Sequence, residues 1–296
     1  MTALGCPSPP PPPPPPALPS APPLVFGLEK SSLLKEALAS SDPGLGARED
    51  VRQLLMRRKE RFRSDLQWIL FCSDVPSLIQ EGPQCGLVAL WMAGSLLAPP
   101  QDTPLERIVA VALQRGYTAQ GEMFSAANMA RLAEEVFGCQ VELLLGGLGE
   151  PNRHHVLQHL ISGYPLLVPY DEDFNHEPCK KRGHKAHWAV SAGVLLGLPG
   201  LALGPDYEED SELKGLFYPA PGKSPLLPEE PPEAVYLLSK QGKSWHYQLW
   251  DYEQLCESNL QLTDLAPGRS TDGKVYVVPP GGVKAGLCGQ SLLLRP

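Results

Sequence analysis

The stretch GPQCGLVALWMAG, residues 82–94, places a thiol at the point where a turn becomes a helix. Gly82 supplies the turn, and the apolar residues that follow Cys85 recur at helical spacing. Cys85 is therefore predicted in the first turn, where unpaired backbone N–H groups and the positive end of the helix dipole favour a thiolate. Such positions lower the pKa of a cysteine below its free value of about 8.5. Gly86 is expected to leave room for a substrate backbone.

A base for this thiol is available in KAHWAVSAGV, residues 185–194. His187 stands at the start of an apolar strand, directly after a polar loop, so its ring is expected at the rim of a sheet beside a cleft. Taken alone, either residue would be read as structural. A cysteine at a helix start, combined with a histidine at a later strand start, is instead typical of cysteine peptidases.

An oxyanion site needs two donors next to the nucleophile. The backbone N–H of Cys85 can supply one, and a side-chain amide ahead of the helix can supply the second. Gln80 and Gln84 are the two candidates.

QEGPQCGLVALWMA followed by HKAHWAVSAGVLLG resembles the papain-like superfamily, and within it the bacteriocin-processing type of cysteine peptidase. The resemblance implies Cys85 as nucleophile, His187 as general base and acid, and Gln80 as the oxyanion glutamine. It also implies an Asp or Asn on the next strand that orients the imidazole. Asp251 in YQLWDY fits this role, Asn259 is the alternative, and a two-residue dyad is the third option.

In motif order, residues 75–260 are also similar to the animal peptidases that process newly made actin, in which a proline-rich N-terminus precedes the peptidase domain. This resemblance implies removal of the acetylated first residue of actin. It also implies profilin, an actin-binding protein that recognises proline runs, as a partner. Two alternatives remain: a non-catalytic adaptor that presents the proline segment, and a cysteine peptidase or acyl transferase acting on ubiquitin-like substrates.

The proline segment is explicit in the sequence, where Pro9–Pro16 are consecutive. Proline lacks an N–H and has a fixed φ, so this run forms neither helix nor sheet and adopts an extended polyproline II rod. Two compatible interpretations are a stiff spacer and a docking peptide for a proline-binding domain.

The remainder of the chain predicts an α+β, papain-like fold, with the nucleophile helix packed on an antiparallel sheet. We expect a disordered proline-rich segment at 1–28, a helical lead-in at 29–72 and a peptidase domain at 73–296, with loop insertions near 171–185 and 203–233. Hydrophobic periodicity predicts helices at 103–115 and 125–137, a short helix at 154–162, strands at 140–145, 164–171, 186–197 and 274–280, and a hairpin at 234–252 that turns at Gly242.

Composition excludes several classes of function. The chain has 296 residues and a formal charge of -8. Its one basic run, RRKERFR at 57–63, lies in a helical pattern with acidic neighbours and is expected to form a solvated helix face, so no nucleic-acid surface is expected. No apolar run is long enough to span a bilayer, so no membrane association and a cytoplasmic location are expected. The seven cysteines are scattered without a C-x-x-C pair and are expected to be free thiols.

One other cluster has residue types that bind metals. HEPCKKRGHKAH contains His176, Cys179, His184 and His187 within a short stretch. The spacing is not that of a common zinc finger, and the basic residues within it would oppose a dication. We expect no metal and no cofactor.

Overall fold

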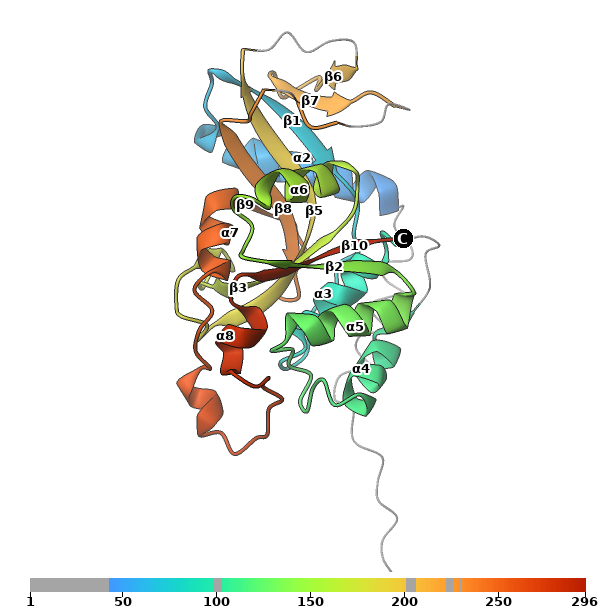
Figure 1. Cartoon of the computed structure of the whole chain (residues 1–296). Coiled ribbons are helices and arrows are strands. Elements are labelled where there is room, and N and C mark those ends of the chain that lie inside the picture. Colours follow the sequence, from blue (N-terminus) through green and yellow to red (C-terminus); the bar gives the residue numbers. More distant parts are fainter. Residues whose placement is uncertain (1–42, 98–102, 201–205, 222–225, 229) are drawn as a thin grey trace, which may run out of the picture.

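In the computed structural model, which describes residues 43–97, 103–200, 206–221, 226–228 and 230–296, helices cover both faces of one mixed sheet (Figure 1). The polyproline run and the first part of the predicted helical lead-in lie outside the described residues. None of the helices in the described part of the chain has the length and apolarity required to cross a bilayer.

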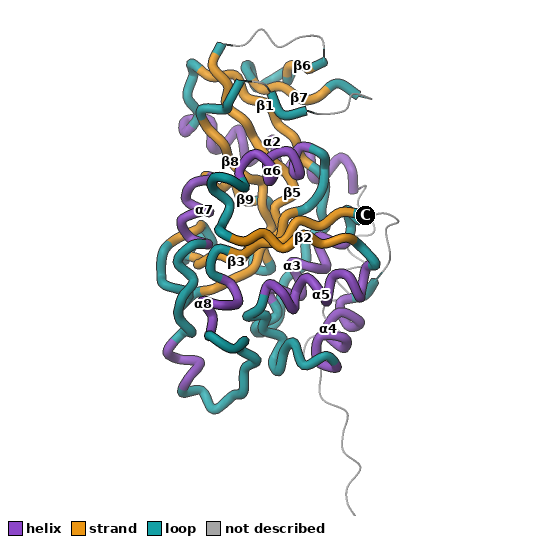
Figure 2. Tube along the Cα trace, in the orientation of Figure 1, coloured by secondary structure: helices purple, strands orange, loops and turns teal. Residues whose placement is uncertain are grey.

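The sheet is organised around β5 (Ala186–Pro199), the strand that carries His187. Its first half pairs antiparallel with β3 (Leu166–Glu172), its second half with β1 (Leu66–Cys72), and most of its length with β8 (Ala234–Gln241). Strands that are distant in sequence therefore meet at β5, as Figure 2 shows.

The remaining strands extend this centre. On one side β10 (Gln290–Arg295) joins β3 to β2 (Gln140–Leu145), and on the other β7 (Leu216–Pro219) pairs parallel with β1 and antiparallel with β6 (Tyr207–Glu209). β9 (Gln248–Asp251) completes a hairpin with β8, and the short β4 (Pro178–Cys179) pairs with the end of β3.

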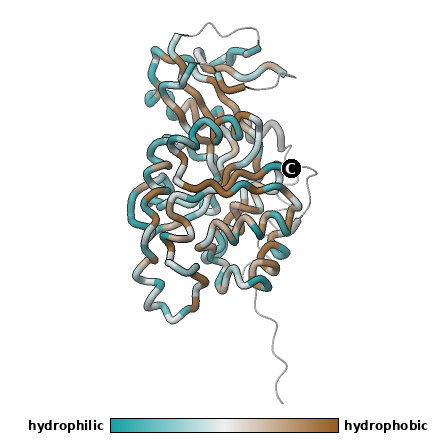
Figure 3. The backbone as a smooth tube through the Cα atoms, viewed as in Figure 1, coloured by the Kyte–Doolittle hydropathy of each residue, from teal (hydrophilic) through white to brown (hydrophobic). Residues whose placement is uncertain are grey.

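Side chains alternate along the strands and form two cores on opposite faces of the sheet. Trp188 and Val190 of β5 face one core, which contains helices α2 (Pro43–Arg58), α3 (Cys85–Gly94), α4 (Leu105–Gln114) and α5 (Ala126–Phe137). Ala189 and Val194 face the other, with α6 (Arg153–Ile161) and α7 (Tyr252–Asn259). Hydrophobic residues are concentrated along the strands between these layers (Figure 3).

Most predicted elements are present. α5 begins after Ser125, whose hydroxyl accepts from Asn128 N, and ends at Gly138, which has a φ of 64°. The hairpin turns at Gly242, as predicted, between β8 and β9. Two further helices, η1 (Lys59–Arg61) and η2 (Pro267–Ser270), are single 3₁₀ turns, and α8 (Gly282–Leu287) precedes β10.

Two predictions are wrong. The helical lead-in does not reach residue 72, because Leu66–Cys72 is strand β1, which pairs with β5. A short apolar run that is buried on both faces has no period that separates strand from helix. The last strand is β10 and not 274–280, where Val277 N donates to the Glu122 carboxylate instead of to a neighbouring strand.

Candidate active site

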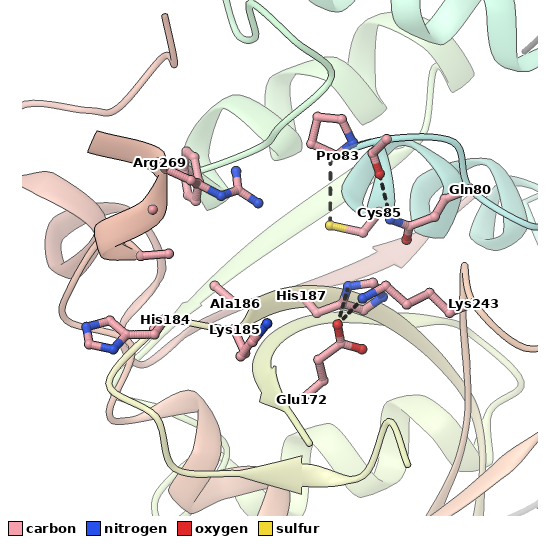
Figure 4. Close-up of a pocket in the computed structure, with 15 residues that line it drawn as sticks. Gln80, Pro83, Cys85, Glu172, His184, Lys185, Ala186, His187, Lys243 and Arg269 are labelled. Atoms are coloured by element: carbon pink, nitrogen blue, oxygen red, sulfur yellow. Dashed lines mark hydrogen bonds and ion pairs between the residues drawn. The ribbon is translucent and has the colours of Figure 1, made fainter. Parts of the chain in front are cut away.

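Cys85 and His187 line the same cavity, which has a volume of about 400 Å³. Figure 4 shows both side chains in the wall of this cavity, with the thiol of Cys85 directed at the carbonyl oxygen of Pro83 at 4.0 Å. Cys85 comes from the start of α3 and His187 from the start of β5, so the cavity lies where the first turn of this helix meets the beginning of the central strand. The two residues singled out by sequence are therefore brought together by the fold.

Cys85 is the first residue of α3, after a turn in which Gly82 has a φ of 56°. All but one of the residues of α3 are buried, so the helix that carries the thiol is fixed within the core. The expectation for Gly86 is wrong. A Cβ at this position would lie 2.7 Å from Met129 Cε, so Gly86 serves the packing of α3 against α5 and not the approach of substrate.

A buried carboxylate shapes the loop that leads to His187. Asp171 accepts from Lys181 N at 2.8 Å, from Gly183 N at 2.7 Å and from Lys185 N at 2.8 Å. Gly183 has a φ of 93°, and a Cβ there would meet the Asp264 carbonyl oxygen at 2.6 Å, so only glycine fits. The loop therefore enters β5 in a fixed conformation and sets the position of His187.

The imidazole of His187 has a carboxylate on one side and the cavity on the other. Its Nδ1 lies 3.8 Å from Glu172 Oε1, and its Nε2 is buried and has no hydrogen-bond partner among the described residues. Glu172 is itself bound by Lys243 and, at 3.0 Å, by His176 Nδ1. In the tautomer that carries its proton on Nδ1, facing Glu172, Nε2 is the nitrogen that can accept a proton from the cavity.

Burial dominates the ionisation of the pair. It raises the pKa of Cys85, opposed by the backbone N–H of Trp188 and by the charges of Arg269 and Lys243. It lowers the pKa of His187 to about 4, while Glu172 acts in the opposite direction. The sequence-based expectation of a depressed thiol pKa is therefore wrong for this conformation, because desolvation outweighs the helix terminus. Thiol and imidazole are both neutral near pH 7.

Glu172 stays ionised beside them. Burial favours its protonated form, but His187, Lys243 and His176 outweigh burial and hold the pKa of Glu172 below its usual value. A fixed negative charge therefore lies behind the imidazole and stabilises it whenever it becomes protonated.

Of the two candidate amides, Gln80 lies in the cavity wall and Gln84 does not line it. Gln80 Nε2 donates to Gly82 O at 2.9 Å, which leaves its second N–H available, while its backbone N–H is tied to Gly242 O at 2.7 Å. Gln84 packs instead against Gly121, whose hypothetical Cβ would lie 2.6 Å from Gln84 Cγ.

The structure does not bring Asp251 or Asn259 to His187. Asp251 caps α7 by accepting from Gln254 N, and it pairs with Tyr236 toward the far end of β5. Asn259 Nδ2 donates to the backbone of β3 and β10. The expectation that either residue orients the imidazole is therefore contradicted by the geometry.

Sequence reasoning missed Glu172. The sequence nevertheless contained a signal for this residue. A strand at 164–171, a loop and a strand at 186–197 follow one another as in a hairpin, which places the end of the first strand beside the start of the second. In the structure Tyr170, which lies two residues before Glu172, pairs with His187. Two cationic residues of the cavity wall, Lys243 and Arg269, were also missed, because they come from distant turns.

The histidine-rich segment is dispersed in space. His176 binds Glu172, and His184 lies 3.8 Å from Asp264 Oδ2 in the cavity wall. Among the residues that the structure describes, no group of three or more His, Cys, Asp or Glu side chains could hold a metal ion.

Comparison with known proteins shows the family to which the chain belongs. Actin maturation proteases of cattle (Bos taurus) and human (Homo sapiens) are 72% and 70% identical to the chain over 281 residues, which is 93% of the chain and 80% of each relative. The chain belongs to the actin maturation protease family. A fruit-fly member (Drosophila melanogaster) is 31% identical over 72% of the chain and 66% of its own length.

The matched region includes the cavity pair. The profile described as actin maturation protease-like, C-terminal domain, covers residues 75–195, which contain Cys85, Glu172 and His187. No solved structure matches the chain, so for this member of the actin maturation protease family the α+β class is observed and the papain-like fold stays a prediction.

Proposed function

We propose that the chain is a cysteine-type peptidase that removes the acetylated first residue of newly made actin. The observation that carries the proposal is the meeting of Cys85 and His187 across one cavity, with the ionised Glu172 behind the imidazole. Membership of a family whose curated members are named actin maturation protease supplies the substrate.

The reaction starts from a neutral pair. Nε2 of His187 takes the thiol proton as Cys85 Sγ attacks the carbonyl carbon of the first residue. The backbone N–H of Cys85 and the amide of Gln80 hold the oxyanion. The proton on Nε2 then passes to the amine of the second residue, the C–N bond breaks, and a thioester remains on Cys85.

Water completes the cycle. His187 removes a proton from water as the oxygen attacks the thioester, and the acetylated amino acid leaves when the C–S bond breaks and the thiol regains its proton. Glu172 stays charged throughout and stabilises the transient imidazolium, in the role of the third member of a triad.

The test is mass spectrometry of the N-terminal peptide of purified, acetylated actin after incubation with the chain. The expected product lacks one acetylated residue, and the Cys85→Ala variant yields none. If a thiol probe labels Cys85 but actin is left unchanged, actin is not the substrate. No labelling and no cleavage would favour the non-catalytic adaptor.

We also propose that Pro9–Pro16, which lie outside the described residues, dock profilin and so deliver profilin-bound actin. Deleting residues 1–24 is then expected to lower kcat/KM on profilin-bound actin and to leave cleavage of a free peptide unchanged. Equal rates on the bound substrate before and after deletion would make the segment a spacer. Equal loss on both substrates would make it part of the fold.

A further inference from the structure

The charge around the cavity is opposite to that of the whole chain. The chain has a formal charge of -8, yet Lys185, Lys243 and Arg269 all line the cavity, and Glu172 is the one carboxylate among its lining residues. Glu172 is already bound by Lys243 and His176. The cavity therefore has cationic groups in excess of the anionic groups that it contains.

Arg269 is fixed in the cavity wall by aromatic rings. Its guanidinium carbon lies 5.0 Å from the centre of the Phe124 ring and 5.1 Å from that of Tyr276, and the group points into the cavity on the side of Cys85 (Figure 4). Contacts of this kind hold a guanidinium in place without using its N–H donors.

Hydrogen bonds of two buried side chains, Glu122 and Trp188, hold the segments that carry these two rings. The buried carboxylate of Glu122 accepts from Gln120 N at 2.6 Å and from Val277 N at 2.7 Å, which joins the segments that carry the rings. Trp188 Nε1 donates to Met123 O at 2.8 Å and fixes the residue before Phe124. The two rings that contact Arg269 are therefore held by the fold and connected through Trp188 to the strand that carries His187.

One donor of this group has no acceptor. Nη1 of Arg269 is buried and has no hydrogen-bond partner among the described residues. Two other arginines are fully paired: Arg115 binds Glu135 through two nitrogens, and Arg63 binds Asp65 in the same way. Arg52 also has buried nitrogens without a hydrogen-bond partner, but its guanidinium lies in ion pairs with Asp210 and Glu212. An unpaired buried guanidinium N–H is costly, so the cavity is suited to a ligand that supplies an oxygen acceptor.

We propose that Arg269 binds a side-chain carboxylate of the substrate close to the scissile bond and thereby selects acidic peptides. This inference rests on the proposed peptidase activity. A carboxylate matches the planar fork of a guanidinium better than any neutral acceptor does. Because the chain as a whole is negative, selection arises from this contact and not from long-range attraction.

The experiment compares acetylated peptides that carry aspartate or asparagine at each of the first three positions after the cleaved bond. Wild type is expected to cleave the aspartate form about 10- to 100-fold better, in kcat/KM, at one of these positions, as for the loss of a charge-assisted hydrogen bond. Arg269→Gln is expected to remove that preference. Arg131→Gln, which changes an exposed arginine of α5 outside the cavity, is the matched control and is expected to retain it.

Two measurements separate the outcomes. If Arg269→Gln slows the aspartate and asparagine peptides by one common factor, Arg269 acts only through the charge that it presents to the Cys85 thiol, and the inference is wrong. Equal cleavage of all peptides by wild type also overturns it. If wild type cleaves nothing, the proposed function fails, and binding of the same peptides to Cys85→Ala tests the inference alone: equal affinities for aspartate and asparagine forms reject it.

Discussion

Two regions of the molecule bury a cysteine and a histidine, and they differ in what the polar atoms contact. In the layer of α6 and α7, burial lowers the pKa of His159 to about 4 and raises that of Cys256 to about 12. In the cavity, burial likewise lowers the pKa of His187 to about 4 and raises that of Cys85. The direction and cause of the shifts are the same in both regions.

The hydrogen bonding is not the same. His159 Nε2 is satisfied by the carbonyl oxygen of Pro165 at 3.1 Å. His187 Nε2 has no partner among the described residues, and neither have Gln80 Oε1 and Arg269 Nη1, which belong to the same cavity wall. Trp250 Nε1 and Asn259 Oδ1 in the layer of α6 and α7 are also buried without a partner, but neither residue lines the cavity. A shifted pKa therefore marks burial in either region, and the candidate site is marked by several unpaired polar atoms that surround one cavity.

The largest expected effect separates the two cysteines. Cys85→Ala is expected to abolish cleavage of an acetylated peptide, because no other side chain can form the thioester. Cys256→Ala is expected to keep kcat/KM within about twofold of wild type while lowering stability by roughly 1 kcal/mol through a small lost volume. Single-turnover assays and thermal melts measure both. Activity in Cys85→Ala would remove the distinction between the regions.

The two histidines are expected to differ next. His187→Gln should lower the single-turnover rate by about 10² or more, as for loss of a general base. His159→Gln should leave that rate unchanged and lower the melting temperature, because its ring is a packed, bonded group. Alkylation of Cys85 by iodoacetamide across pH gives an independent readout. An identical profile in wild type and His187→Gln would show that the imidazole does not act on the thiol.

Lowering the pH should destabilise both regions, because each contains a buried neutral histidine. Each histidine has a folded-state pKa of about 4 against an ordinary value of 6.5, so the unfolded chain binds more protons between these values and folding stability falls as pH falls. Between pH 7.5 and 5, each histidine is expected to cost about 2 kcal/mol. Urea unfolding at both pH values measures the loss, and His159→Gln and His187→Gln should each reduce it. If the free energy of unfolding falls by the same amount between these pH values in wild type and in both variants, the histidines are not buried in the neutral state.

The smallest expected effect concerns the carboxylates. Glu172→Gln should lower kcat/KM about tenfold. It should also move the acid limb of the pH profile of kcat/KM to lower pH, because Glu172 raises the pKa of His187 and its loss lowers that pKa. Asp251→Ala should leave kcat/KM unchanged and cost about 1 kcal/mol of stability through the lost helix cap. The reverse result, with activity lost in Asp251→Ala alone, would return the orienting role to Asp251.

The local features of the candidate site were predictable from sequence. The turn at Gly82 followed by a helical pattern fixed Cys85 in the first turn, and the polar-to-apolar change before Trp188 fixed His187 at a strand start. These features depend on neighbours within a few residues, where backbone sterics and hydrophobic period decide the structure. The cap at Ser125 and the stop at Gly138 were predictable for the same reason.

The errors have a different origin. β1 and β10 are buried on both faces, so their apolar runs have no alternation, and their strand state is set by pairing with β5 and β3. The sequence favours Asp251 as the orienting residue because it ends the next strand. The hairpin register, however, carries that residue to the opposite end of β5 from His187.

The sequence by itself therefore determined which thiol and which imidazole are the candidates for the proposed reaction, because each is defined by its own short stretch of chain. The tertiary structure alone decided what surrounds them. Glu172, Lys243 and Arg269 reach the cavity from three separated segments, through strand pairing, a hairpin turn and a seat of two aromatic rings. It also decided the protonation state of the pair, because the desolvation that raises one pKa and lowers the other depends on burial by residues distant in sequence.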